Sequence, residues 1–152
     1  MKYFGTTARN AALAIACLIA SNSVTADDHE KPGVKFYNKA DLAGAVFQRD
    51  DVINEKEMID GALWTAKDVN IFTSDDDVLD IGFYQSDAVR SPVESYDVDE
   101  LMIFLKGGVN LIHEDGSVTE VRAGDAVFIE KGWKGIWDTD GYEKIYVIYS
   151  TD

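Results

Sequence analysis

The chain has 152 residues, which is enough for one domain with a hydrophobic core and too few for two domains of usual size. Acidic residues outnumber basic ones by 28 to 14, and the net charge at pH 7 is −14. Nucleic acids and anionic membranes are recognised through basic patches, so this charge balance argues against both as partners. Solubility, or a salty habitat, explains the acidic surface without any partner.

The first 26 residues have the pattern of a secretory signal peptide. Lys2 and Arg9 supply a positive n-region, residues 11–20 form an unbroken apolar run, and residues 24–26 (Val-Thr-Ala) match a small-x-small cleavage site. The apolar run is too short to span a bilayer stably. We therefore expect a periplasmic or secreted protein, cleaved near Ala26.

The position of cleavage decides whether Cys17 and His29 can take part in covalent modification or metal binding. Cys17, the only cysteine, falls inside the signal, so the mature chain has neither a disulfide nor a thiolate metal site. A lipoprotein would need the apolar run to end at Cys17, but the run continues to Ala20. Cleavage after Ala26 would place His29 third in the mature chain, where an amine, two backbone amides and an imidazole form a square-planar set for Cu²⁺ or Ni²⁺.

Residues 27–60 are expected to form an N-terminal arm and a loose cover segment. The first part, residues 27–33, is polar and charged. Residues 40–47 carry small and apolar side chains at helical spacing, and residues 54–60 are compatible with one helical turn. We expect the sheet of the domain to begin after this segment, at residue 61.

From Gly61 onward, short strand-like segments alternate with turns. The turn signals are Ser74 to Asp77, Gly107-Gly108, the Asp-Gly pair within residues 114–117, and Gly124-Asp125. Segments separated in this way at eight to twelve residues predict an all-β antiparallel barrel or sandwich over residues 61–152. The expected strand segments are 62–65, 69–73, 78–85, 101–105, 109–113, 118–121, 126–129, 133–137 and 144–149.

The segment from Leu101 to Leu105 is apolar on both faces of the expected strand. One face can line the interior of a barrel, and the other needs cover. A second subunit would supply this cover in a homodimer, and intrachain cover by a second sheet or by the N-terminal segment is the equal alternative.

The spacing around Glu100 resembles a known family. Glu100, six residues and Gly107 match the end of the first cupin motif, and residues 124–132 resemble the opening of the second. Residues 132–137 and 144–148 are similar to the cupin branch grouped with the ureidoglycine aminohydrolase domain. The resemblance extends from about Trp64 to Tyr149 and implies a cupin-type antiparallel β-barrel, or jelly-roll. The short N-terminal extension before it can contain a helical turn. Because one fold hosts many chemistries, it implies little about the reaction.

The residues that carry metal in the family are largely replaced. Metal-binding cupins have two histidines ahead of the glutamate and a third after the second motif; Glu94, Tyr96 and Gly135 occupy those positions here. The proline usual in the second motif is replaced by Glu130. One remaining carboxylate is not a transition-metal site, so we expect no histidine-bound metal. A hard divalent cation held by Glu94, Glu100 and a third oxygen stays open as an alternative.

Glu100 and Tyr96 are the candidate catalytic residues. The resemblance implies that Glu100 points into the barrel, where a carboxylate in apolar surroundings suits acid–base chemistry. A structural carboxylate hydrogen-bonded by Tyr96 is the equal alternative. We expect His113 to face solvent beside its hairpin turn. The expected ligand-binding side chains, each also explained by ordinary core filling or a solvated rim, are Tyr84, Glu94, Met102, Phe128, Trp133 and Trp137.

The sequence thus predicts an exported cupin-like protein that holds a small organic ligand in an aromatic, carboxylate-containing cavity. One alternative is an enzyme of the lyase, isomerase or aminohydrolase type, in which Glu100 acts as acid or base or binds a hard divalent cation. The other is a non-catalytic structural or interaction protein whose barrel is plugged by Met102, Phe104, Phe128 and Trp137.

Overall fold

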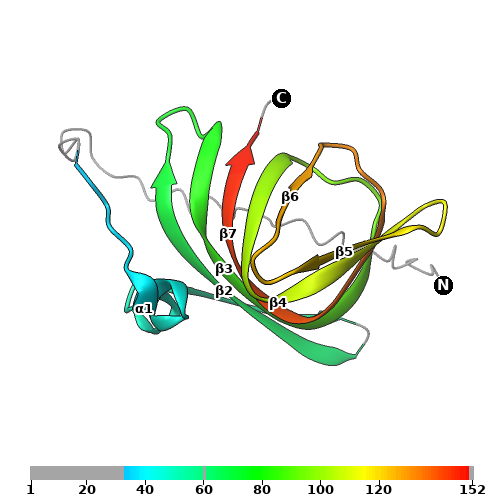
Figure 1. Ribbon diagram of the computed structural model, residues 1–152, viewed down its shortest axis with the longest axis horizontal. Helices are drawn as coiled ribbons and strands as arrows, with labels where there is room; N and C mark the ends of the chain where they lie inside the picture. The colour runs from blue at the N-terminus through cyan, green and yellow to red at the C-terminus, as the bar shows by residue number, and fades with distance from the viewer. Residues whose placement is uncertain (1–32, 60, 151–152) are drawn as a thin grey trace, which may run out of the picture.

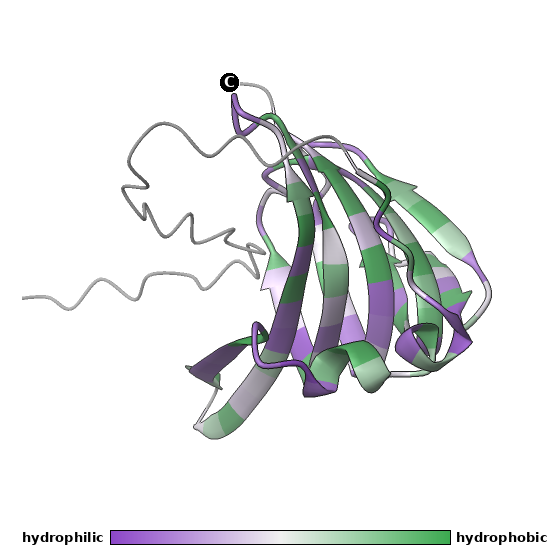
Figure 2. Cartoon of the chain, turned by 90° about the vertical axis from the view of Figure 1, so that its left-hand side faces the viewer, coloured by the Kyte–Doolittle hydropathy of each residue, from purple (hydrophilic) through white to green (hydrophobic). Residues whose placement is uncertain are grey.

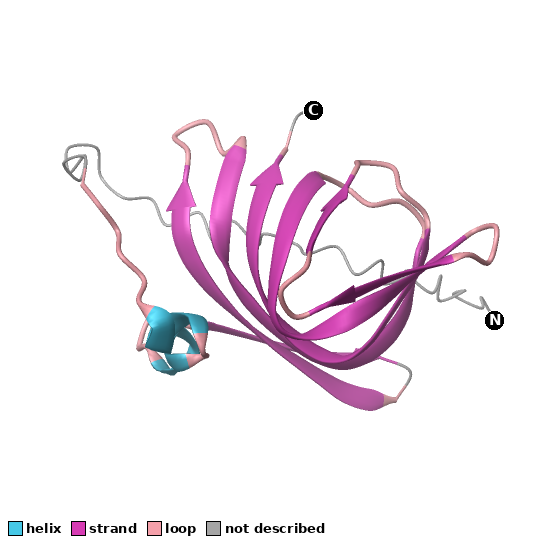
Figure 3. Cartoon of the chain, in the orientation of Figure 1, coloured by secondary structure: helices cyan, strands magenta, loops and turns pink. Residues whose placement is uncertain are grey.

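The computed structural model describes residues 33–59 and 61–150. Within these residues, seven β-strands form one sheet that curls around itself, and two short helical segments lie outside it (Figure 1 and Figure 3). No helix in this part of the chain is long and apolar enough to cross a membrane. The expected signal peptide, its cleavage site near Ala26, and His29 lie outside the described residues.

The elements follow each other with short connections. They are helix α1 (Lys39–Leu42), the 3₁₀-helix η1 (Ala45–Gln48), and strands β1 (Ile53–Ile59), β2 (Ala62–Thr73), β3 (Leu79–Val93), β4 (Asp99–His113), β5 (Val118–Arg122), β6 (Ala126–Ile129) and β7 (Gly135–Tyr149).

Strand β4 organises the sheet, whose order is β1-β2-β3-β7-β4-β5 with β6 also paired to β4. On one side β4 pairs with β7 from Asp99 to His113; on the other it pairs with β6 at its start and β5 at its end. Every pairing is antiparallel. The register of β4 and β7 shifts around Gly107, where φ is 64° and an added Cβ would lie 2.0 Å from the Gly141 carbonyl oxygen. This glycine bend lets one long strand curve around the barrel.

Hydrophobic and hydrophilic residues alternate along the strands (Figure 2). The buried hydrophobic side chains form two separate cores. The interior of the curled sheet is a large cluster that includes Trp64, Tyr84, Phe104 and Ile148. The second cluster lies on the outer face, where Val46 and Phe47 of η1 pack on Val69 and Phe83, together with Leu105 and Ile145.

The expectation of an all-β antiparallel barrel is confirmed. The Asp115-Gly116 hairpin is also confirmed: Gly116 has φ of 83°, and its amide donates to the His113 carbonyl at 2.9 Å. Several expected pairs of short strands are single long strands in the structure, because bends and bulges do not interrupt their pairing. Residues 62–73 form β2, and residues 135–149 form β7.

The helical turn expected at residues 54–60 is wrong. Residues 53–59 form strand β1, which pairs with β2 from Ile53 opposite Asp68 to Ile59 opposite Ala62. The Glu-Lys-Glu run favours helix locally, but the hydrogen bonds of the neighbouring strand outweigh that small propensity. The sheet therefore begins before residue 61.

The helical structure expected at residues 40–47 is largely confirmed by α1 and η1. This segment packs more closely on the sheet than the loose cover that the sequence predicts. Asn38 caps α1 with a capping box: its side chain accepts from the Ala40 and Asp41 amides, and the Asp41 carboxylate accepts from the Asn38 amide. Val46 and Phe47 are buried. This segment is an integral cover over one part of the outer face.

Candidate functional site

A buried ion pair lies at the centre of the barrel. Glu100 on β4 and Lys144 on β7 have no solvent-exposed side-chain surface, and Lys144 Nζ donates to Glu100 Oε1 at 2.6 Å. The Tyr96 hydroxyl donates to the other carboxylate oxygen, Oε2. Both oxygens of Glu100 are therefore engaged by side chains of the chain itself.

The Lys144 ammonium lies in soft, polarisable surroundings. Its nitrogen is 3.1 Å from Met102 Sδ and 5.7 Å from the ring centroids of Tyr84, Trp137 and Tyr142. Such rings attract a desolvated cation through their quadrupoles. Burial lowers the pKa of Lys144, while the charge of Glu100 and its hydrogen bond raise it. Burial and the neighbouring Glu100 charge hold the pKa of Tyr96 well above its usual value, so the phenol stays protonated and donates.

Carboxylates lie on the side of the barrel formed by β1 and β2. Tyr84 donates to Glu55 at 2.9 Å, and Tyr146 donates to both oxygens of Asp68 at 3.1 and 3.3 Å. Burial raises the pKa of Asp68 to about 6, and the hydrogen bond from Tyr146 partly opposes this rise. Asp68 thus differs from an ordinary surface carboxylate.

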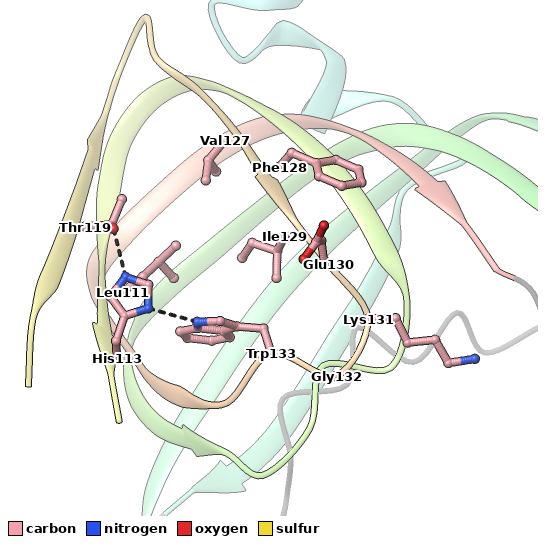
Figure 4. Close-up of a pocket in the computed structure, with 10 residues that line it drawn as sticks. All are labelled: Leu111, His113, Thr119, Val127, Phe128, Ile129, Glu130, Lys131, Gly132 and Trp133. Carbon is pink, nitrogen blue, oxygen red and sulfur yellow. Dashed lines mark hydrogen bonds between the residues drawn. The ribbon is translucent and has the colours of Figure 1, made fainter. Parts of the chain in front are cut away.

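A separate cavity of about 650 Å³ opens between the end of β4, strand β5, strand β6 and the loop before β7 (Figure 4). Leu111, Val127 and Ile129 supply apolar surface, and the polar contributors include Glu130 at the rim. The complete lining comprises Leu111, His113, Thr119, Val127, Phe128, Ile129, Glu130, Lys131, Gly132 and Trp133. Glu100 is not part of this lining.

A hydrogen-bonded chain of three side chains forms one wall of this cavity (Figure 4). Trp133 Nε1 donates to His113 Nδ1 at 3.1 Å, and His113 Nε2 lies 2.8 Å from Thr119 Oγ1. An indole N–H is only a donor, so His113 Nδ1 must accept and the ring in this arrangement is neutral, with its hydrogen on Nε2 facing Thr119. The expectation that His113 faces solvent is wrong: it is half-buried, because β5 and the loop before β7 fold over its end of β4.

Gly135 explains how Trp133 reaches this wall. An added Cβ at Gly135 would lie 2.6 Å from the Trp133 ring and 2.3 Å from the Ile112 carbonyl oxygen. The position that carries a histidine in the metal-binding motif is thus filled by the indole of a neighbouring residue. A larger side chain at residue 135 would displace Trp133.

The donor set does not fit a histidine-bound metal. Glu94 is exposed, Tyr96 is bound to Glu100, and Gly135 has no side chain. Among the described residues no group of three histidine, cysteine or carboxylate side chains is placed to hold a metal ion. At Glu100 a lysine ammonium already supplies positive charge, and a divalent cation there would face like-charge repulsion.

The structure distributes the sequence-derived candidates over three places. Tyr84, Met102 and Trp137 lie around the Lys144 ammonium. Lys144 and Tyr96 both donate hydrogen bonds to Glu100. Trp133 lies in the cavity wall. Phe128 pairs with the outward-facing Leu101 and points away from Val127 and Ile129 (Figure 4), and Glu94 is exposed.

Sequence reasoning missed Lys144 and His113. The signal for Lys144 was present: residues 144, 146 and 148 alternate along a strand, so a lysine shares a face with a tyrosine and an isoleucine. A lysine on such a face needs a buried partner. For His113, Thr119 lies across its own hairpin, but the contact with Trp133 comes from a loop twenty residues away and leaves no local signal.

Comparisons with known proteins agree with this architecture. Residues 75–146 match the family described as the EutQ-like cupin domain. The EutQ protein of Clostridium difficile is 21% identical with a TM-score of 0.52, over 63% of this chain and 75% of that one. A protein of unknown function from Pseudomonas syringae pv. tomato is 25% identical with a TM-score of 0.53, over 63% of this chain and only 44% of that one. A cupin 2 conserved barrel domain protein from Rhodopseudomonas palustris is 16% identical with a TM-score of 0.50, over 67% and 74% of the two chains.

A search of curated proteins finds no match to this sequence. Residues 75–146 are thus similar to the EutQ-like cupin domain, and the chain shares the fold of these solved structures. At these low identities the structural likeness shows the fold alone, so the chemistry has to be argued from the site itself.

Proposed function

We propose that this protein is an exported cupin that binds a small, largely apolar molecule in the cavity beside Trp133, without a histidine-bound metal. The observation that carries the proposal is the cavity of about 650 Å³, whose lining combines aliphatic side chains and one indole with His113, Thr119, Glu130 and Lys131. Small-molecule sites in proteins typically measure about 300–1,000 Å³ and combine apolar walls with a few polar groups.

The wall chemistry supports an aromatic or otherwise planar occupant. Leu111, Val127 and Ile129 offer apolar contact, and the Trp133 ring is held in place by its hydrogen bond to His113. A fixed indole loses little conformational freedom when a ligand binds. Glu130 and Lys131, which both belong to the lining, carry opposite charges and so favour a ligand without net charge.

The test compares two valine-to-tryptophan variants. Val127→Trp fills the cavity, and Val118→Trp places the same ring on an exposed position of β5 outside it. A panel of small aromatic and aliphatic compounds is screened by thermal shift, and hits are titrated by tryptophan fluorescence. We expect hits to lose at least tenfold in affinity with Val127→Trp and to be unchanged with Val118→Trp.

Two results would remove the proposal. One is a panel in which no compound raises the melting temperature of the wild-type protein. The other is a set of hits that bind Val127→Trp as tightly as wild type, because their site would then lie elsewhere.

An enzymatic alternative is favoured by one observation, the contact of Glu100 with two proton donors, Tyr96 and Lys144. A lyase, isomerase or aminohydrolase would use Glu100 as acid or base. Such a substrate would have to open a fully buried ion pair. Turnover of a substrate that survives Glu100→Gln would eliminate this alternative.

Export is supported by the sequence pattern of residues 1–26. The measurement is N-terminal sequencing of protein recovered from the periplasm or the medium. A mature chain that begins at residue 27 would support export and would also place His29 third, where Cu²⁺ binding lost on His29→Ala tests the square-planar site. Protein that retains Met1 and stays in the cytoplasm would contradict export.

We also propose that the protein forms a homodimer through the outer face of β4. Register places a charge-free apolar row across five strands, from Phe72 through Ile81, Val147 and Leu101 to Phe128. Three of these residues, Phe72, Leu101 and Phe128, are exposed. In a chain of net charge −14, a second copy offers an equally uncharged face, so the contact would bury no charge.

A further inference from the structure

We infer that the Lys144 ammonium takes the place of the metal cation in this barrel, so that a side chain of the chain itself is the positive charge around which Glu100 and Tyr96 are arranged. The inference does not depend on the ligand-binding proposal, since the ion pair and the cavity beside Trp133 are separate.

The position of Glu100 is the first support. Glu100 is the one residue of the metal motif that remains, and it faces the barrel interior with no exposed surface. Uncompensated, a buried carboxylate is strongly unfavourable. The ammonium at 2.6 Å on Oε1 and the Tyr96 phenol on Oε2 together satisfy it, as a metal and a neighbouring ligand would.

The register of the strands is the second support. In the β4–β7 pairing, Glu100 lies opposite Ile148, and Lys144 lies opposite Phe104. The two side chains therefore lean toward each other along the interior and meet beside Met102, which lies between Glu100 and Phe104 on β4. The Lys144 nitrogen ends beside Met102 Sδ, with three aromatic rings around it. A long, flexible stem with a compact charge at its end suits this geometry.

The replaced histidine positions are the third support. Tyr96 is committed to Glu100, and the space beside Gly135 is filled by the Trp133 ring. Loss of the metal ligands and gain of an internal cation are thus parts of one arrangement. It follows that the fold needs no metal and that Glu100 is occupied whether or not a ligand is present.

The first experiment measures metal dependence in the wild-type protein. Protein purified without chelator is analysed for metals, and its melting temperature is recorded with EDTA and with added Mn²⁺, Ni²⁺, Zn²⁺ or Ca²⁺. We expect less than one tenth of a metal equivalent and no change in melting temperature. A stoichiometric metal that is absent from Glu100→Gln would overturn the inference.

The second experiment is a double-mutant cycle. Lys144→Met and Glu100→Gln are made singly and together, and unfolding is followed in urea. We expect each single variant to unfold at a clearly lower urea concentration than wild type. The double variant should lose much less stability than the sum of the two single losses, because it leaves no buried charge unpaired. Additive losses would contradict the role of Lys144 as the counter-ion. The matched control is Lys106→Met, which removes an exposed lysine from Glu143 and should change the midpoint little.

The third experiment replaces the missing cation. Lys144→Ala leaves space beside the Glu100 carboxylate, and ethylammonium or butylammonium chloride should raise its melting temperature above that given by equal NaCl. For wild type and for Lys106→Met, the melting temperature in alkylammonium chloride should equal that in NaCl at the same concentration. If Lys144→Ala does not fold at all, its recovery from inclusion bodies in the presence or absence of the alkylammonium salt gives the same comparison, and equal recovery counts against the inference.

Discussion

Asp68 on β2 is a partly buried carboxylate whose hydrogen-bond donor is the Tyr146 phenol. Burial is the main reason that its pKa is raised to about 6, and the charges of Asp80 and Glu55 add to the rise. A raised pKa means that the folded protein holds the proton more tightly than the unfolded chain. This group therefore lowers stability as the pH rises from about 4 to about 6, and the loss persists above pH 6.

Replacing Asp68 by asparagine should remove this penalty. The amide oxygen still accepts from Tyr146, but no charge is buried. We expect Asp68→Asn to be more stable than wild type by about 2–3 kcal/mol at pH 7.5 and nearly equal at pH 4. Urea unfolding at both pH values measures the difference. A gain of the same size at both pH values would mean that charge is not the cause.

Gly135 permits the close approach of three parts of the chain. Its missing side chain leaves room for the Trp133 ring and the Ile112 carbonyl. Gly135→Ala should lower the free energy of unfolding by about 2 kcal/mol or more, because the neighbouring backbone cannot move aside easily. Ile136→Val is the control on the same strand, with an expected loss of about 1 kcal/mol or less. Near-equal stability of Gly135→Ala and wild type would show that the loop before β7 adapts.

At the scale of elements, the 3₁₀-helix η1 decides how the outer face of the sheet is completed. Val46 and Phe47 pack on Val69 of β2 and Phe83 of β3. Leu105, the last residue of the apolar segment in β4, packs against this same cluster. Leu101 and Ile103, further towards the start of β4, are exposed. Intrachain cover is therefore present near Leu105, whereas the face of the same strand near Leu101 is open.

Shortening a buried side chain of η1 to alanine should show that this helix belongs to the folded domain. Phe47 is almost fully buried, so Phe47→Ala should lower the free energy of unfolding by about 3–4 kcal/mol. Leu42 of α1 is 36% exposed, and Leu42→Ala should lower it by about 1 kcal/mol or less. Thermal or urea unfolding gives both values. If the two variants lost equally little, residues 39–48 would be loose cover.

At the scale of the whole molecule, net charge and the apolar face act in opposite directions. Two copies of a chain with a charge of −14 repel one another, and the repulsion is screened by salt. The apolar row on the outer face favours association, and this contribution does not weaken with salt. We therefore expect dimerisation to strengthen between low and physiological ionic strength.

A single charge on this face should separate the subunits. Leu101 lies near the middle of the row, so Leu101→Glu would bury two carboxylates in a symmetric contact. We expect a monomer by sedimentation velocity or light scattering. Val118→Glu on β5 introduces the same charge at an exposed apolar residue outside the row and should remain dimeric. A wild-type protein that is monomeric at every salt concentration and at high protein concentration would end the proposal.

Local pattern was sufficient for those features whose causes lie close together in the chain. The Asp115-Gly116 hairpin follows from the positive φ that glycine tolerates, and the strands follow from alternation of apolar and polar residues. The spacing from Glu100 to Gly107 indicated the fold through a resemblance. The same local reasoning failed at β1, since residues 53–59 form a strand only because β2 lies beside them.

The barrel at Glu100 shows where the tertiary structure was needed. Through the resemblance of the two motifs, the sequence predicted an inward carboxylate near Tyr96 and the loss of the metal-binding histidines at positions 94, 96 and 135. Lys144 lies 44 residues further along the chain, and the His113–Trp133 contact spans 20 residues. Such contacts depend on strand register and on the curvature of the sheet, which no local pattern encodes. The sequence therefore determined a barrel with an inward carboxylate, and only the fold decided that an ammonium fills the space beside it.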